Sequence, residues 1–402
     1  MVAKAPDQPG RDNHAPLTDT SLARQFSSLV RNVTVIPPRI ENPLPLEPVF
    51  DAATDLHPGL LEARPKLYML EEQFGYSASE LEHCASKVGV SSPIKLLSKT
   101  GLEKFRRLVR LFKEQGLVVS EKNPDRDAAR GCTYHSRFLC DFMSDSTVLD
   151  CFSRIAGIEL IPLPIRYNQV QINMLPAYAP DAEEPGFGTH IDSTNFACVL
   201  DITEDRGMQG GALQHALMTR EQFFLRSGSS ANVAYAELHM VLPENELLTT
   251  RFTEEGSAVF HQGSLVPHQV ENVRKVNGMR DTVAFTLHPA NPMVRRFDFF
   301  STASTWNSRG IKEDIGNLLV ELAARRIEAI NGALGLVEDL ADTADAIGPE
   351  QLGELRAGLH NSEQLKRAAE QFLVDLAHGI AGISCPDDTF EIPSVFDVSY
   401  KG

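Results

Sequence analysis

The segment GTHIDST constrains the fold most, because it places His190 and Asp192 two residues apart. On a β-strand, residues i and i+2 point to the same face, so this imidazole and this carboxylate can reach one metal ion. Farther along the chain, His268 can supply a second imidazole. Two imidazoles and one carboxylate on one side of a metal leave the opposite positions open. We therefore predict a metal site made of His190, Asp192 and His268, carried on strands.

A strand downstream of His268 carries a second set of polar residues. The turn residues Asn277 and Gly278 lead into it, and Arg280, Thr282 and Ala284 would share one face. Val283, Phe285 and Leu287 would face the other way. A planar guanidinium binds a carboxylate in two places, and a neighbouring hydroxyl adds a third donor. Arg280 and Thr282 could hold a carboxylate in this way; the alternative is a structural ion pair beside a residue that merely favours strands.

Two segments before His268 complete the pattern. In PIRYNQVQINML, Gln169, Gln171 and Asn173 alternate with Val170, Ile172 and Met174, which indicates a strand with one polar face. That face either lines a ligand site or belongs to a solvated edge strand. In MQGGAL, the adjacent Gly210 and Gly211 permit a tight reversal of the backbone.

Taken in this order, the motifs resemble those of the Fe(II)- and 2-oxoglutarate-dependent dioxygenase superfamily, in particular its prolyl-hydroxylase-like and phytanoyl-hydroxylase-like branches. The resemblance implies a mainly β catalytic core with α elements, a double-stranded β-helix (jelly roll) flanked by N- and C-terminal helical elements. It implies Fe(II) on His190, Asp192 and His268, and 2-oxoglutarate as a co-substrate held by Arg280, Thr282, Gln171 and Asn173. O₂ would be consumed, with ascorbate as a stimulant.

The resemblance also guides the choice of the third ligand and the reaction type. His261 competes with His268 as the third ligand. The arginine downstream of His261 is Arg274, and it is followed by Val276 where the family has Ser or Thr. Gly263 also stands where the family has an apolar residue. The other downstream histidines, His215, His239 and His288, are interpreted as surface or satisfied core residues. Halogenases of the superfamily replace the carboxylate ligand by a small residue, so Asp192 favours hydroxylation, desaturation or ring formation.

The implied activity is oxidation of a C–H bond in a small-molecule substrate, amino-acid-like or biosynthetic, with release of succinate and CO₂. Arginines that could anchor a carboxylate of that substrate are Arg166, Arg206, Arg220 and Arg295. Two alternatives remain: a cupin-type metal isomerase or 2-oxoglutarate-independent dioxygenase, and a catalytically silent jelly-roll binding protein.

The net charge of −16 argues against a nucleic-acid partner, which would require a positive stripe. No stretch reaches 18 uninterrupted apolar residues, the first residues lack an apolar signal region, and the six cysteines show no C-x-x-C pairing. We therefore expect a cytoplasmic enzyme with reduced thiols and no membrane partner.

Four regions are expected along the chain: a disordered tail over 1–20, a helical and extended arm over 21–97, the jelly-roll core over 98–292 and a helical extension over 293–402. The core would begin with a helix whose capping box is Thr100 and Glu103. Its buried stripe would be Leu102, Phe105, Leu108, Val109 and Phe112. Apolar stripes in the C-terminal extension favour a monomer with helices packed on the core, or a homodimer paired through these helices.

Overall fold

The computed structural model describes residues 44–81, 84–122, 125–163, 166–178, 187–192, 194–228, 237–238 and 242–290. The expected tail over 1–20, the first part of the expected arm and the expected helical extension over 293–402 lie outside these ranges. Within the described ranges, none of the helices combines the length and the apolar character needed to cross a membrane.

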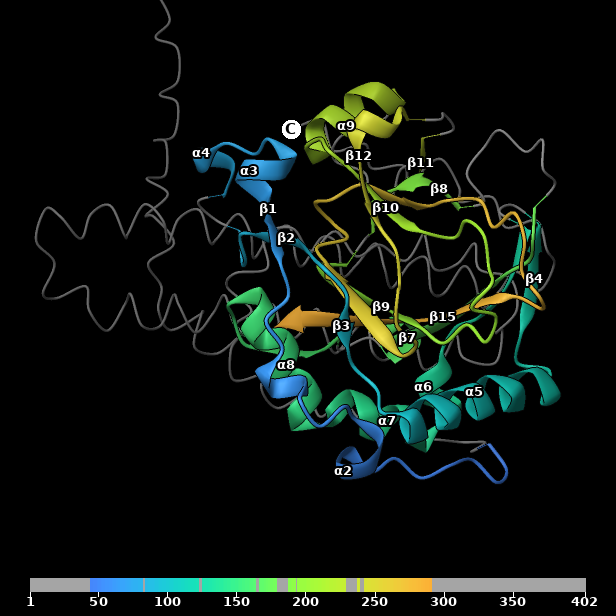
Figure 1. Ribbon diagram of the computed structural model, residues 1–402. Coiled ribbons are helices and arrows are strands. Elements are labelled where there is room, and N and C mark those ends of the chain that lie inside the picture. The colour runs from blue at the N-terminus through green and yellow to red at the C-terminus, as the bar shows by residue number, and fades with distance from the viewer. Residues whose placement is uncertain are drawn as a thin grey trace, which may run out of the picture. The chain divides into compact units, whose positions relative to one another are not determined.

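Two antiparallel sheets form the framework (Figure 1). The larger sheet runs in the order β1-β2-β13-β9-β15-β7-β5-β4, with β3 added to β13 and β6 added to β15. Its strands are β1 (Leu67–Met69), β2 (Val88–Ser91), β3 (Ile94–Lys95), β4 (Val119–Lys122), β5 (Asp125–Ala129), β6 (Leu160–Pro162), β7 (Val170–Leu175), β9 (Phe196–Asp201), β13 (Ser257–His261) and β15 (Arg280–Pro289). The smaller sheet runs β11-β8-β14-β10-β12. Its strands are β8 (Phe187–His190), β10 (Leu213–Ala216), β11 (Glu237–Leu238), β12 (Leu247–Thr250) and β14 (His268–Val270). The expectation of a mainly β core with helices is confirmed.

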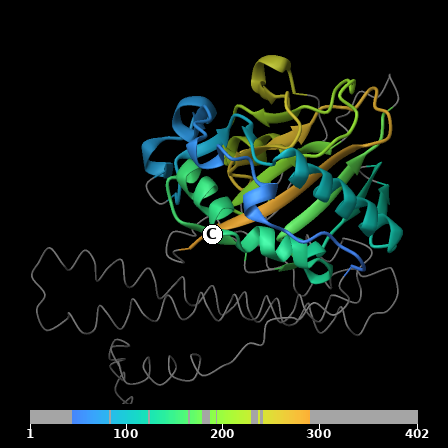
Figure 2. The ribbon, with the colours of Figure 1, turned by 60° about the horizontal axis from the view of Figure 1, so that its bottom comes forward.

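Alternation along β15 gives the larger sheet two different faces. Val283, Phe285 and Leu287 belong to a large apolar cluster with residues of the helices that cover this face. Those helices are α5 (Lys99–Glu114), α7 (Arg137–Ser144) and α8 (Ser146–Ala156), and Figure 2 shows them along one side of the sheet. Arg280 and Thr282 have the opposite parity, so they point away from the helices, as the sequence predicted. Remaining helical segments are α2 (Ala52–Asp55), α3 (Leu70–Phe74), α4 (Ala78–Leu81), α6 (Cys132–His135), α9 (Arg220–Ser227), η1 (Leu60–Glu62), η2 (Arg166–Asn168) and η3 (Glu244–Glu246).

Helix α5 buries the stripe that its apolar spacing predicted, from Leu102 to Phe112. Its start differs from the prediction. The N-cap is Ser98, whose side chain accepts a hydrogen bond from the amide of Gly101, and Thr100 lies inside the helix. Ser98 caps the helix because its backbone is extended, at φ −69° and ψ 173°, which directs its hydroxyl toward the free amides of the first turn.

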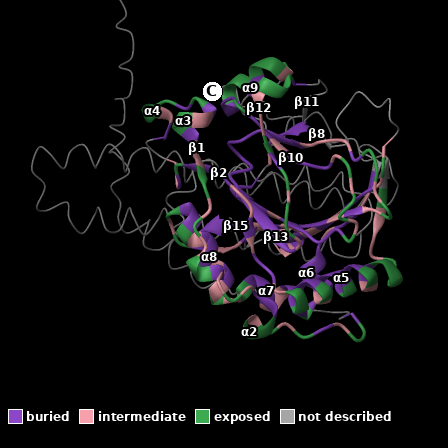
Figure 3. Cartoon of the chain, in the orientation of Figure 1, coloured by how far each residue is buried: buried purple, intermediate pink, exposed green. Residues whose placement is uncertain are grey.

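The second face of the larger sheet packs against the smaller sheet. Val90 and Val259 of the larger sheet belong to the same apolar cluster as Leu213 of the smaller one, and Val270 packs against that cluster. On its far side, the smaller sheet is covered by α9, whose Phe223 and Phe224 cluster with Ala216. Figure 3 shows buried residues along the facing strands and exposed residues on the outer sides of the helices.

The segment expected to form an arm contributes strands to the larger sheet. Within this helical and extended arm, Leu67–Met69 forms β1 and Leu70–Phe74 forms a short helix. The reason is long-range: β1 pairs with β2, and β2 pairs with β13 at Val90 and His261. Sequence periodicity carries no information about such partners.

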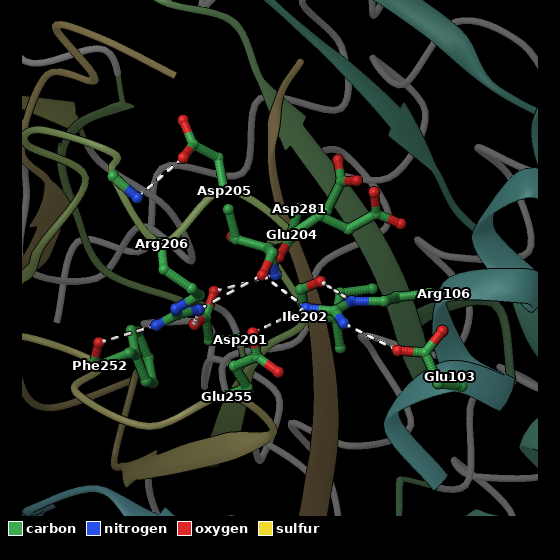
Figure 4. Close-up of polar contacts among 12 residues, drawn as sticks. Glu103, Arg106, Asp201, Ile202, Glu204, Asp205, Arg206, Phe252, Glu255 and Asp281 are labelled. Carbon is green, nitrogen blue, oxygen red and sulfur yellow. Dashed lines mark hydrogen bonds and ion pairs between the residues drawn. The ribbon is translucent and has the colours of Figure 1, made fainter. Parts of the chain in front are cut away.

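A buried arginine ties α5 to the end of β9. Arg106 donates hydrogen bonds to the carbonyls of Ile202 (3.0 Å) and Thr203 (2.8 Å), and to Glu103 at 3.0 Å (Figure 4). Arg106 is therefore a structural residue, which fixes the helix against the strand that lies beside β15.

Candidate metal centre

His190 and Asp192 come together at the end of β8. His190 is the last residue of the strand, and Asp192 lies just beyond it, so the pair is not within one strand as its spacing suggested. The side chains still alternate in direction beyond the strand. Ile191, between the two, is buried on the opposite side in the apolar cluster with α9. His190 Nε2 lies 3.8 Å from Asp192 Oδ1. The amide of Asp192 donates to the carbonyl of Gly263 at 2.9 Å, which holds the backbone beyond the strand in place.

His268 completes the group from the neighbouring strand. On β14 it pairs directly with His190, and the two rings are 4.2 Å apart between centroids. Its Nε2 lies 3.7 Å from Asp192 Oδ2. The ligand atoms of His190, Asp192 and His268 all lie within 4.8 Å of one another, which is the spacing of groups that can share one ion.

Hydrogen bonds at the back of both rings favour metal binding at the front. His190 Nδ1 lies 2.8 Å from the carbonyl of Gly188, and His268 Nδ1 lies 3.0 Å from the carbonyl of Val266. A carbonyl only accepts, so each Nδ1 carries the hydrogen and each Nε2 keeps its lone pair. Burial, and then the charge of His268, hold the pKa of His190 well below its usual value, so His190 is neutral, as a ligand must be.

The surroundings of Asp192 shift its carboxyl group toward the protonated form. Burial raises its pKa, and the charges of His268 and Arg130 act in the opposite direction. Its side chain is still 27% exposed, so solvent reaches part of the carboxylate. A divalent cation held by Asp192 and the two histidines would favour the charged form of Asp192.

The rival ligand His261 lies behind His268 and outside the group. It is on β13 of the facing sheet, and its ring is 4.4 Å from that of His268. Its Nδ1 lies 3.1 Å from Nε2 of His215, which sits opposite His268 on β10. Burial, with the charge of His268, lowers the pKa of both His215 and His261 well below the usual value. Among the described residues, these two form a neutral pair that supports His268, and the ligand group contains neither.

Arg280 and Thr282 lie on the inner face of the larger sheet. They are 2% and 1% exposed. Nε and Nη2 of Arg280 are buried and have no hydrogen-bond partner. Burial lowers the pKa of Arg280, while the charges of Asp201 and Asp281 and the Tyr178 hydroxyl act in the opposite direction. The side chain therefore presents an unsatisfied planar fork in the interior. An ordinary structural ion pair, the alternative given by the sequence, is not seen among the described residues.

The glycine pair of MQGGAL gives the Arg280 side chain its space. Gly210 and Gly211 have φ of +81° and +72°, conformations that favour glycine. A Cβ on Gly211 would lie 2.7 Å from Cδ of Arg280, and one on Gly210 would lie 1.9 Å from the carbonyl oxygen of Asn272. The glycine turn predicted from the sequence thus lies directly against the Arg280 side chain.

Gln171 and Asn173 share the inner face with Arg280. In the register between β7 and β15, Gln171 is opposite Ala284 and Asn173 is opposite Thr282. Gln171 Nε2 donates to Asn173 Oδ1 at 2.5 Å, and both side chains are half-buried. Strand β7 lies between β15 and β5, so the alternative of a solvated edge strand is wrong.

Sequence reasoning missed Asp201, a buried acid beside this face. It pairs with Thr282 in the register between β9 and β15, and its Oδ2 accepts from Arg206 Nη1 at 2.9 Å (Figure 4). An aspartate ending the apolar run NFACVLD was the available signal. Asp201 supplies a negative charge near Arg280 while Arg206 balances it.

Comparisons with known proteins give matches in structure only. No family model matches the sequence, and neither does any curated protein. Among solved structures, the chain is similar to the epimerase SnoN in complex with Fe3+, alpha ketoglutarate and nogalamycin RO, at 12% identity over 54% of this chain and 86% of that one, with a TM-score of 0.38. It is also similar to the alpha ketoglutarate dependent carbocyclase SnoK from nogalamycin biosynthesis, at 12% identity over 56% and 88% and a TM-score of 0.36.

A prolyl 4-hydroxylase from Phytophthora capsici matches at 12% identity over 76% of this chain and 91% of that one, with a TM-score of 0.31. Identities near 12% and TM-scores below 0.4 leave the function of this chain to be argued from its own residues.

Proposed function

We propose that this protein is a non-haem Fe(II)- and 2-oxoglutarate-dependent oxygenase that oxidises a C–H bond of a small-molecule substrate. One observation carries the proposal: the His190, Asp192 and His268 group and the unsatisfied Arg280 fork both lie between the two sheets. His261 on the inner face of the larger sheet contacts His268, which supports a metal group that faces the same interior. A metal group that faces a buried arginine would suit an acid that chelates the metal at one end and offers a carboxylate to Arg280 at the other.

The donor set fits Fe(II). Two imidazole Nε2 atoms and a carboxylate would hold the ion from one side and leave the other side open, which suits non-haem iron. Bound there, Fe(II) with 2-oxoglutarate would supply the activation of O₂, yielding succinate, CO₂ and an oxidised substrate. Because Asp192 keeps the carboxylate ligand, we favour hydroxylation, desaturation or ring formation over halogenation.

The residues around Arg280 fit the far carboxylate of 2-oxoglutarate. Nε and Nη2 lie on one edge of the guanidinium, so they can donate to two carboxylate oxygens at once. The Thr282 hydroxyl is 3.5 Å from the carbonyl of Asn173, a long contact that leaves it available to donate elsewhere. Gln171 and Asn173 add amide groups on the same face. Binding the anion would satisfy donors that are otherwise costly to bury.

The proposal extends to the fold and the setting of the enzyme. The two facing sheets would form a double-stranded β-helix over about residues 98–292, to which β1, β2 and β3 add strands. A small-molecule substrate, no nucleic-acid or membrane partner and a cytoplasmic site of action are part of the proposal. So is a monomer or a homodimer paired through the C-terminal region.

Anaerobic titration and turnover together test the proposal. The protein should bind one Fe(II), and 2-oxoglutarate should then bind only to the iron-loaded protein with appearance of a visible charge-transfer band. Admitting O₂ in the presence of ascorbate should give succinate. Absence of iron binding would favour a silent binding protein, and O₂ consumption without 2-oxoglutarate would favour the cupin-type alternative.

A further inference from the structure

A row of side-chain hydrogen bonds crosses the smaller sheet behind the metal group. Thr189 of β8 donates to Oε1 of Gln269 on β14. Gln269 Nε2 donates to Oε1 of Gln214 on β10 at 2.7 Å, and Gln214 Nε2 donates to Oγ1 of Thr249 on β12 at 3.4 Å. These four strands are consecutive neighbours in the sheet. The polar row, as we call these four residues, therefore ties the strand of His268 to the strands on both of its sides.

The polar row lies on the outer face of the smaller sheet, whereas the histidine ligands lie on its inner face. Gln269 directly follows His268 in β14, so the two side chains point to opposite faces. Gln214 shares its parity with Ala216, which clusters with α9 on the outer side. Gln269 therefore does not reach an ion held by His268, and its influence on that ion passes through the backbone.

The polar row is buried where it adjoins the metal ligands. Thr189 is 0% exposed and Gln269 is 3% exposed, whereas Gln214 is half-buried and Thr249 is exposed. A buried polar group without a hydrogen-bond partner is costly, so the Thr189 hydroxyl and the Gln269 amide hold each other where water does not compete. Gln214 accepts from the nitrogen of that amide, which leaves the amide oxygen directed toward Thr189.

The pairing of β8 with β14 is irregular beside the metal group. His190 pairs with His268, and Phe187 pairs with Val270. Three residue steps along β8 thus match two along β14, so two residues of β8 stand opposite one residue of β14. This is the arrangement of a β-bulge, which bends its strand and redirects nearby side chains. The direction of the His190 side chain therefore depends on the shape of this bulge.

The bulge carries the group that orients the His190 ring. Its two residues are Gly188 and Thr189, and Gln269 stands opposite them. The Gly188 carbonyl is 2.8 Å from His190 Nδ1 and accepts its hydrogen, so it sets the rotation of the ring. Thr189 is bonded across to Gln269. A shift of the bulge would move the Gly188 carbonyl and turn His190 relative to His268, and the bond to Gln269 opposes that shift.

We propose that Gln269 is a positioning residue of the metal centre, which acts by holding the bulge of β8 through the Thr189 hydroxyl. This inference rests on the proposed function, because it requires that His190 and His268 bind a metal ion. Gln269 fixes the relation between the two imidazoles before the ion binds, so binding requires less rearrangement of the strands. Partners outside the ligand shell commonly tune metal affinity in this way.

Variants that preserve the size of the side chain test the proposal. Thr189→Val removes the hydroxyl and Gln269→Met removes the amide, and each should weaken Fe(II) binding about tenfold or more in anaerobic titration. Thr189→Ser keeps the hydroxyl and should restore Fe(II) affinity toward that of wild type. Thr249→Val is the matched control, because it makes the same change at the exposed end of the polar row, on a strand that does not adjoin β14. It should bind Fe(II) like wild type.

Two further measurements separate positioning from a purely structural role. Co(II) accepts the same kinds of ligand, and its visible spectrum depends on the coordination geometry. That spectrum should change in Thr189→Val and Gln269→Met and stay unchanged in Thr249→Val. The double variant Thr189→Val/Gln269→Met should weaken Fe(II) binding no more than the stronger single variant, because both changes remove the same bond.

Urea unfolding of the metal-free variants completes the test. If Thr189→Val and Gln269→Met lose stability but keep the Fe(II) affinity and Co(II) spectrum of wild type, the bond only stabilises the sheet and the inference is wrong. Additive losses in the double variant would likewise contradict it. If neither buried variant folds, Gln214→Met decides, because it releases the Gln269 amide from a half-buried position; an unchanged Co(II) spectrum there would overturn the inference. If wild type binds no metal ion, the proposed function fails first.

Discussion

Gly263 and Asp192 approach each other so closely that only glycine fits. A Cβ on Gly263 would lie 2.0 Å from Asp192 Oδ2 and 2.7 Å from its Cγ. The same two residues are joined by the hydrogen bond from the Asp192 amide to the Gly263 carbonyl. Gly263 therefore sets the position of the carboxylate that faces both histidines. In the sequence alone, Gly263 was informative only as a departure from the family pattern that follows the third ligand, which disfavoured His261.

Replacing Gly263 by alanine should weaken the metal site. The added methyl group would push the Asp192 carboxylate away from His268, and changes next to ligands typically cost 10–100-fold in metal affinity. We expect a loss of that size in Fe(II) affinity by anaerobic titration. Gly59→Ala is the control, because its Cβ would meet nothing closer than 3.5 Å. Equal Fe(II) affinity in the two variants would contradict the role given to Gly263 in positioning Asp192.

The choice between His268 and His261 has a direct test. Alanine at His190, Asp192 or His268 should abolish stoichiometric Fe(II) binding and turnover, because each change removes one of three ligands. His261→Ala should keep the iron, with at most a modest loss, because His261 only packs against His268 and bonds His215. Metal content after desalting measures both. Retention of iron by His268→Ala with loss in His261→Ala would reverse the assignment.

Arg280→Lys should weaken 2-oxoglutarate binding and leave Fe(II) binding intact. Lysine keeps the charge but loses the fork, so we expect a loss of about 1.5–3 kcal/mol, the scale of a hydrogen bond to a charged group. The dissociation constant of 2-oxoglutarate in the iron-loaded protein measures it. Arg137→Lys serves as the exposed control. A dissociation constant like that of wild type would remove Arg280 from the site.

The sequence predicted what depends on local pattern. Alternation of residues along the strand predicted the face shared by Arg280 and Thr282. The helical spacing of apolar residues predicted the buried stripe of α5. Contacts between distant segments were not readable. The cradle that Gly263 forms for Asp192 joins two loop positions, one just beyond β13 and one just beyond β8. The helix start was missed because Ser98 and Thr100 are both chemically suitable caps, and only the backbone conformation selects Ser98.

Asp281 lies on the outer, helix-covered face of β15, between Arg280 and Thr282 in the sequence. Its Oδ1 is buried and has no hydrogen-bond partner. Burial raises its pKa to about 6, with Glu204 and Asp201 acting in the same direction and Lys113 and Arg106 against it. The unfolded chain, with an ordinary aspartate pKa near 3.8, releases this proton earlier than the folded protein.

Asp281→Asn should therefore stabilise the protein at neutral pH. Below about pH 4 the carboxyl is protonated in both states and costs nothing, and between pH 4 and 6 the folded protein loses stability as pH rises. Above pH 6 the penalty is complete, about 1–3 kcal/mol, and asparagine removes it.

Asp205→Asn is the opposite case, because hydrogen bonds from the amides of Asn277 and Gly207 lower the pKa of Asp205. That variant should be less stable than wild type near pH 7, and the difference should vanish on acidification. Urea unfolding at pH 4, 5, 6 and 7 measures both, and a constant difference between Asp281→Asn and wild type across this range would contradict the raised pKa.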